Sequence, residues 1–279
     1  MPGTAESSRF MSVLAVNVIC TSYSGNTWLN LMLGAHSQAF CVGEYKNIRK
    51  TGRVNCMLHG QECPVWSRFD PSAEGHPYLQ LSRLTGKNVF VISNSLDYLP
   101  ADPGPEIEQR FIHLIRDGRA VAASFRRKHA GMNIWQAARR WRHDYLKNIR
   151  RLNRFPSTAV LPVRYEELKS NPEKEVRRIC EFLGLPFEPQ MLEYWNQDQH
   201  YLGGNQGTLF ALARKQGADL PEASRREQGR ETRDWKLDFY AGSDPQKFTD
   251  DRWKKDLTPV QLRIFDLAAG ALNRKLGYQ

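Results

Sequence analysis

The sequence has no long apolar run, no internal repeat and no low-complexity segment. Its longest apolar stretches, residues 13–16 and 111–115, are far shorter than the roughly 20 residues that a transmembrane helix needs. We therefore expect no integral membrane segment. The first ten residues are polar, with a single base at Arg9, and lack the apolar middle of a secretion signal. This absence favours a cytoplasmic protein.

The chain has few cysteines, and their number is odd. The five cysteines are Cys20, Cys41, Cys56, Cys63 and Cys180. Without a secretion signal they are expected to be reduced thiols. A chain of 279 residues can bury enough surface to fold without disulfide bonds.

Acidic residues are outnumbered, with 30 Asp and Glu against 40 Lys and Arg and a net charge of +10. This excess favours an anionic partner, which could be nucleic acid, an acidic surface or a phosphate-bearing ligand. Many bases follow the polar face of an expected helix at 133–153, and no recognised nucleic-acid motif accompanies them, so we expect no nucleic-acid partner. The 41% hydrophobic and 25% charged residues exclude a disordered or collagen-like chain.

Hydrophobic patterning predicts strands that alternate with helices. The expected strands are 13–20, 88–92, 110–115 and 159–163, and the expected helices are 27–36, 119–128, 133–153, 172–183 and 258–276. This alternation is typical of an α/β fold with three layers, in which helices cover both faces of a central parallel sheet. We expect one domain over residues 1–279, with elaborated loops at about 48–85 and 205–250. His113, inside an apolar strand, is expected to be a core histidine.

The segment 20–28 leaves a buried strand and enters a helix, which suits the binding of a phosphate. Gly25 lets the backbone approach an anion, the helix start adds partial positive charge, and Ser24, Asn26 and Thr27 supply side-chain donors. The lysine of the nucleotide-triphosphatase loop is missing, which argues against an ATP or GTP hydrolase. Taken alone, the segment is explained equally well by an ordinary capped helix.

A second candidate anion site follows the strand 110–115. Arg116 stands where open α/β sheets bind ligands, and a guanidinium there can hold a phosphate through two parallel hydrogen bonds. Ser124 on the following helix could add a neutral donor. The alternative is a structural ion pair of Asp117 with Arg116 or Arg119.

Together, S-G-x-T-W and the later R-D-G-R-A-V-x-x-S resemble the motifs of sulfotransferases that use 3′-phosphoadenosine 5′-phosphosulfate (PAPS). The flanking sequences are similar to those of the bacterial, carbohydrate and tyrosylprotein branches, and the resemblance runs from about residue 13 to residue 278. It implies a P-loop-like fold, PAPS as donor, adenosine 3′,5′-bisphosphate (PAP) as product, and a small-molecule or carbohydrate acceptor that offers a hydroxyl or amine.

The resemblance also assigns roles to residues. Ser24, Gly25, Asn26 and Thr27 would hold the 5′-phosphosulfate, and Ser22, Tyr23 and Trp28 of the same loop would also belong to the donor site. Arg116 and Ser124 would hold the 3′-phosphate, and Gly204 and Asn205 would close over the nucleotide. Glu44 matches the acidic base of the tyrosylprotein branch, the alternative being a surface glutamate before a basic loop.

The sequence departs from the family at one position. Where relatives carry Lys or Arg before the Ser-Gly of the first loop, this chain has Tyr23, whose phenol carries no charge near neutral pH. The missing cation could come from the loop after Glu44, which contains Lys46, Arg49, Lys50 and Arg53. The departure keeps open the alternative of a nucleotide-binding protein without turnover. A second alternative is a nucleotide kinase with a degenerate phosphate loop, against which the missing loop lysine counts.

Cys56, His59 and Cys63 are soft ligands close together in the sequence. A structural zinc site needs four ligands, and the sequence shows no clear fourth, so no metal is expected. Paired cysteines before a tryptophan also resemble the acceptor-side loop of bacterial relatives. A packed loop, with an occasional disulfide, is the expected arrangement.

Overall fold

A computed structural model describes residues 12–46, 48, 52, 54–94, 96, 103–218 and 251–279. Its centre is a five-stranded sheet of order β2-β3-β1-β4-β5, in which each neighbouring pair is parallel. The strands are β1 (Val13–Cys20), β2 (Ala39–Gly43), β3 (Val89–Ser93), β4 (Ile107–Ile115) and β5 (Val160–Arg164). The expected α/β class and parallel sheet are confirmed. Strand β2 was not predicted from the sequence, since five residues that end in glycine are too short for a periodic signal.

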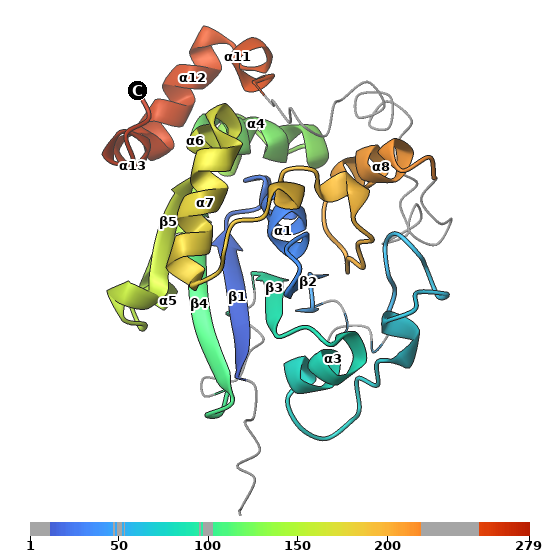
Figure 1. Cartoon of the computed structure of the whole chain (residues 1–279). Helices are drawn as coiled ribbons and strands as arrows, with labels where there is room; N and C mark the ends of the chain where they lie inside the picture. Colours follow the sequence, from blue (N-terminus) through green and yellow to red (C-terminus); the bar gives the residue numbers. More distant parts are fainter. Residues whose placement is uncertain are drawn as a thin grey trace, which may run out of the picture.

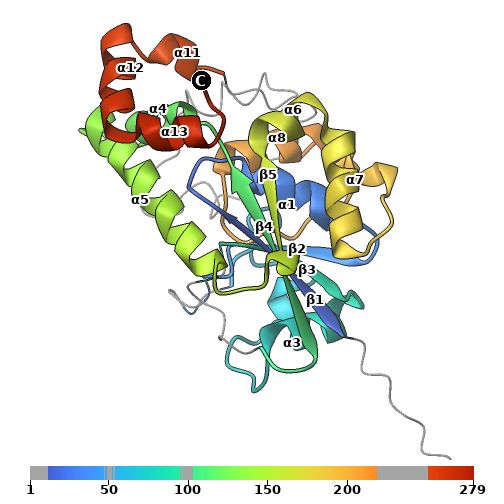
Figure 2. The same ribbon diagram turned by 90° about the vertical axis from the view of Figure 1, so that its left-hand side faces the viewer.

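Helices cover both faces of the sheet. They are α1 (Asn26–Gly34), α3 (Pro77–Thr85), α4 (Gly118–Lys128), α5 (Ile134–Leu152), α6 (Tyr165–Ser170), α7 (Pro172–Leu183), α8 (Gln206–Lys215), α11 (Trp253–Asp256), α12 (Pro259–Phe265) and α13 (Ala271–Lys275). Helices α7 and α5 lie on opposite sides of the strands (Figures 1 and 2). The three expected layers are therefore present. No helix in the described ranges is long and apolar enough to span a bilayer.

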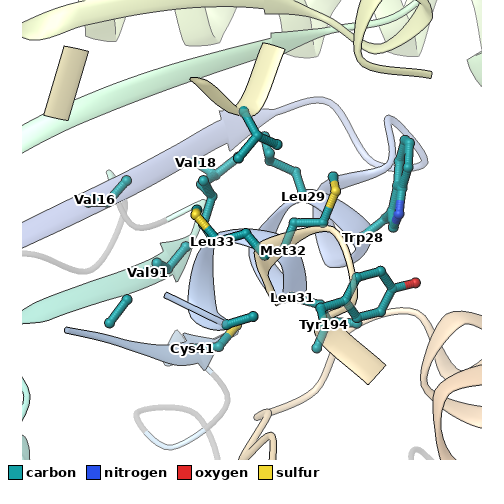
Figure 3. Packing of buried hydrophobic residues seen from close by; sticks show 14 of the residues in the cluster. Val16, Val18, Trp28, Leu29, Leu31, Met32, Leu33, Cys41, Val91 and Tyr194 are labelled. Atoms are coloured by element: carbon teal, nitrogen blue, oxygen red, sulfur yellow. The ribbon is translucent and has the colours of Figure 1, made fainter. Parts of the chain in front are cut away.

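Alternate side chains of β1 enter different cores. Val16 and Val18 pack against α1, which contributes Leu29 and Met32 to the same cluster (Figure 3). Ala15 on the opposite face packs with the aromatic side chains around α3. Burial on both faces explains why β1 is a nearly continuous apolar run. It also holds the end of β1, where the candidate phosphate loop begins, at a defined place.

The two expected long loops are partly helical. The range 48–85 contains α3, which begins at a proline after the capping His76. The range 205–250 was expected to be a loop, but its first part forms α8, capped by the Asn205 side chain. A short, largely apolar helix without strong periodicity gives a weak sequence signal, which explains this miss. Residues 219–250 lie outside the described residues.

His113 is a buried core residue of β4, as expected, and its ring lies 5.3 Å from that of Tyr145. Desolvation lowers the pKa of His113 to about 4. The unfolded chain, in which a histidine titrates near pH 6.5, therefore binds more protons than the folded chain between about pH 4 and 6.5.

We expect His113 to make folding sensitive to acid. The stabilisation from its neutral ring is complete above about pH 6.5 and is lost as pH falls toward 4, by up to about 3 kcal/mol. Urea unfolding at several pH values should show a smaller loss for His113→Gln than for the wild type. The exposed His143→Gln on α5 is the control. Parallel pH profiles for all three proteins would contradict this role.

Candidate active site

The loop between β1 and α1 has the backbone shape of an anion cradle. Gly25 caps α1 with a φ of 91°, and a Cβ there would lie 2.6 Å from the Tyr165 ring, so only glycine fits. Tyr23 also has a positive φ, 67°. The first N–H groups of α1 have no acceptor within the helix and can bind an anion.

The side chains of this loop are held at different depths. Ser22 is exposed, whereas Ser24 is fully buried and its Oγ lies 2.8 Å from the Thr21 Oγ1. The Asn26 Oδ1 is buried without a hydrogen-bond partner in the described part of the chain. Trp28 is only 4% exposed and packs edge-on against Tyr165, with 6.0 Å between ring centroids. Trp28 therefore supports the loop from the core.

Arg116 joins the end of β4 to this loop. Its Nη1 donates a hydrogen bond of 2.8 Å to the Tyr23 carbonyl oxygen, and its guanidinium lies over the Tyr165 ring at 4.3 Å. One ion pair considered as an alternative does form, between Arg119 and Asp117 at 2.7 Å. Asp117 caps α4 and thus has a structural role. The structure brings together the two candidate phosphate sites.

Ser124 lies on the buried face of α4. Its Oγ donates to the Ala120 carbonyl at 3.0 Å and accepts a hydrogen bond of 2.9 Å from Nη2 of Arg127. Arg127 also pairs with Asp256, before α12. Arg127 does not stand out in the sequence because it lies within a run of three bases at the end of α4. Its spacing of three from Ser124 on a helix was the available signal.

The Tyr23 phenol lies against α4. Its hydroxyl is 3.1 Å from the His129 Nε2, its ring packs edge-on against Phe125, and the Lys128 Nζ lies 5.2 Å from the ring centre. Burial raises the pKa of Tyr23, so the phenol stays neutral at physiological pH. Tyr23 therefore does not supply the cation that relatives have at this position.

Glu44 follows β2 directly. Its backbone N–H donates to the Leu202 carbonyl at 2.6 Å, and its partly exposed carboxylate lies 3.3 Å from the Lys46 Nζ. Desolvation raises the pKa of the buried Cys20 thiol at the end of β1, and the nearby charges of Glu44 and Lys46 raise and lower it, respectively. Glu44 and Lys46 therefore lie close to the start of the phosphate loop. The other candidate cations, Arg49, Lys50 and Arg53, lie outside the described residues.

Tyr201 connects the Glu44 segment to Gly204 and Asn205. A Cβ at either Gly43 or Gly204 would lie 2.6 Å from the Tyr201 ring, so the ring packs directly on both glycines. The Asn205 N–H donates to the Thr27 Oγ1 at 3.0 Å, which places this segment on the phosphate loop. The role of Tyr201 was not predicted from the sequence, because no local pattern distinguishes it from other core aromatics.

The order of the sheet, the loop and the helix places this chain in a known class of folds. A parallel sheet whose first strand leads through a glycine turn into a helix is a P-loop-like α/β fold. A family model described as "Sulfotransferase family" matches residues 108–189, which include Arg116 and Ser124. Over this segment the chain is similar to the sulfotransferase family.

Curated relatives and solved structures agree with this assignment. The chain is 34% identical over 91 residues to a putative protein-tyrosine sulfotransferase of Caenorhabditis briggsae, covering 30% of this chain and 32% of the relative. It is 24% identical over 201 residues to protein-tyrosine sulfotransferase A of Caenorhabditis elegans, covering 61% and 50%. The chain thus spans half or less of the length of these relatives.

Two solved structures share the fold over almost the whole chain. The sulfotransferase domain from the curacin biosynthetic pathway has a TM-score of 0.61 at 18% identity, covering 95% of this chain and 97% of that one. The sulfotransferase domain from the Synechococcus PCC 7002 olefin synthase has a TM-score of 0.50 at 19% identity, covering 91% and 94%. At such low sequence identity, these structural similarities establish the fold alone.

Proposed function

We propose that this chain is an enzyme that transfers a sulfuryl group from PAPS to a hydroxyl or amine. The observation that carries the proposal is the hydrogen bond from Arg116 to the carbonyl of Tyr23, which couples two anion-binding segments. A donor with phosphates at both its 5′ and 3′ positions needs two such segments. A nucleotide kinase does not need the second one, and the loop lysine that it does need is absent.

Each end of the donor has its own residues in this proposal. Ser24, Gly25, Asn26 and Thr27 hold the 5′-phosphosulfate, with the first N–H groups of α1 directed at its oxygens. Arg116, Ser124 and Arg127 hold the 3′-phosphate, since Arg127 already donates to the Ser124 hydroxyl. Gly204 and Asn205 close over the nucleotide from the segment that Tyr201 anchors. In this proposal the chain is one domain, which carries all of these groups.

Glu44 is the proposed general base. As the acceptor oxygen or nitrogen bonds to sulfur, its proton passes to the Glu44 carboxylate. The bond from sulfur to the bridging oxygen of PAPS breaks, and the electron pair stays on the phosphate of PAP. Catalysis then depends on positioning and on charge stabilisation, as in phosphoryl transfer.

A cavity lined in part by Tyr45, the residue that follows Glu44 in the sequence, is the proposed acceptor site. It has a volume of about 760 Å³, within the usual range for small ligands. Its wall includes Phe69 and His76. The His76 Nε2 is buried without a hydrogen-bond partner among the described residues, and desolvation lowers the pKa of His76, which favours a neutral ring in this wall.

Calorimetry with PAP and with ADP tests the donor assignment. PAP should bind far more tightly, because ADP lacks the 3′-phosphate that Arg116 and Ser124 would contact. Equal affinities would overturn the assignment, and phosphate release from ATP would favour the kinase instead.

Incubation with labelled PAPS and a panel of carbohydrate, phenol, lipid and peptide acceptors then tests transfer. PAP binding with no transfer to any acceptor would indicate a binding protein.

We expect Lys46 to supply the missing cation. Lys46→Gln should lower turnover by about tenfold, less than loss of a buried oxyanion donor costs, because Lys46 is partly exposed to solvent. Tyr23→Lys should change turnover little, since its side chain lies on α4. Steady-state rates with saturating PAPS measure both, with Lys174→Gln on α7 as control. A large gain from Tyr23→Lys, with no loss from Lys46→Gln, would contradict this expectation.

A further inference from the structure

Four potential metal ligands converge beside the active site. They are Cys56, His59, Cys63 and His200, and their ligand atoms all lie within 4.8 Å of one another. We call this group the cysteine–histidine cluster. The first three are neighbours in sequence, whereas His200 comes 137 residues after Cys63. The structure thus supplies the fourth ligand that the sequence did not reveal.

The spacing within the cluster is close to that of a tetrahedral zinc site. Bonds of about 2.3 Å to sulfur and about 2.0 Å to nitrogen place the ligand atoms of such a site roughly 3.3–3.8 Å apart. The Cys56 Sγ lies 3.5 Å from the His59 Nδ1, and the Cys63 Sγ lies 3.4 Å from the His200 Nδ1. The two pairs need to approach each other by only about 1 Å to meet this geometry.

The outer contacts of the cluster are those of a metal site. Asp198 reaches both imidazoles on the side away from the sulfurs, at 3.0 Å from the His59 Nε2 and 3.5 Å from the His200 Nε2. One carboxylate therefore orients both rings with Nδ1 toward the thiols, as carboxylates do for zinc-bound histidines. The Trp66 backbone N–H also points at the Cys63 sulfur, at 3.4 Å.

We propose that the cysteine–histidine cluster binds one zinc ion as a structural site. Two thiolates and two neutral imidazoles form a closed set of four ligands, which leaves no open position for a substrate. Two thiolates also balance the charge of the ion. Both cysteines are fully buried, which shields the sulfurs from water, whereas His59 and His200 are partly exposed.

The zinc would join two segments that both reach the active site. The Trp66 Nε1 donates to the His200 carbonyl at 2.6 Å, and the Met57 N–H donates to the Tyr201 carbonyl at 2.8 Å. The His200 ring also stacks on Phe40 of β2. Because the residue after His200 packs on Gly43 and Gly204, the ion would fix the segments that carry Glu44 and Asn205. This proposal concerns metal binding and does not depend on the proposed transferase activity.

Metal analysis of the full chain, purified under reducing conditions without chelator, tests the proposal. Mass spectrometry of the digested protein should find about one zinc per chain, and displacement by Co²⁺ should produce the visible spectrum of tetrahedral thiolate-bound cobalt. Cys63→Ser and His200→Asn should lose the zinc. Cys180→Ala and His143→Asn, which change the same residue types elsewhere, should keep it.

Two further variants separate ligation from folding. His59→Cys preserves a ligand at a partly exposed position and should retain zinc even if His200→Asn misfolds. Asp198→Asn should weaken zinc binding about 10- to 100-fold in a chelator competition, because it removes only the orienting carboxylate. Metal-free wild-type protein with five free thiols, or with a Cys56–Cys63 disulfide, would overturn the proposal. Retention of zinc by both Cys63→Ser and His200→Asn would also overturn it.

Discussion

Glu44→Gln is expected to lower turnover by about 10²- to 10⁴-fold, the usual contribution of a general base. Glutamine keeps the size of the side chain but cannot accept the proton that the acceptor loses as it attacks sulfur. The backbone of Glu44 is fixed by its hydrogen bond to Leu202, so the substitution should leave the loop in place. Rates of transfer from labelled PAPS, measured at saturating donor, report this effect.

The affinity for PAP serves as the internal control for Glu44→Gln. The carboxylate is proposed to act on the acceptor and not on the nucleotide, so calorimetry should find nearly unchanged PAP binding. Glu181→Gln on the exposed side of α7 is a matched substitution and should keep full activity. Wild-type turnover in Glu44→Gln, on an acceptor whose chemical step limits the rate, would mean that another group is the base.

Arg116→Ala is expected to weaken PAP binding roughly 30- to 1,000-fold, or about 2–4 kcal/mol. Arg116 is 6% exposed, and its contacts with the Tyr23 carbonyl and the Tyr165 ring hold the guanidinium in a desolvated position. Removal of the guanidinium would leave the 3′-phosphate without its charged partner. Titration calorimetry of the variant with PAP gives the effect directly.

ADP distinguishes lost phosphate recognition from a damaged loop. Arg116 also holds the β1–α1 loop through its hydrogen bond to Tyr23. If the substitution collapsed this loop, the binding of ADP and the binding of PAP would weaken alike. Loss of 3′-phosphate recognition should weaken PAP only. Arg119→Ala removes a neighbouring arginine that pairs with Asp117 and stacks on Trp253, and should change the PAP-to-ADP ratio little. If Arg116→Ala leaves the ratio of PAP affinity to ADP affinity unchanged, Arg116 does not bind the 3′-phosphate.

The sheet was largely predictable from the sequence, except for one of its two edge strands, β2. Strands β1 and β4 are apolar over most of their length because both of their faces are covered, and that pattern is visible in the sequence. Strand β2 has five residues, and α8 is short and buried, so neither has enough periods to stand out. Such elements are specified by the packing partners available to them.

The sequence by itself determined the fold class, the glycine turn between β1 and α1 and the position of Arg116 at the end of β4. These features are local, because a strand, a glycine turn and the start of a helix depend on neighbouring residues. Only the tertiary structure decided that Arg127 reaches Ser124, that Tyr201 packs on Gly43 and Gly204, and that His200 joins Cys63. Contacts between residues far apart in the chain depend on how the helices and loops pack on the sheet, and no local periodicity records that packing.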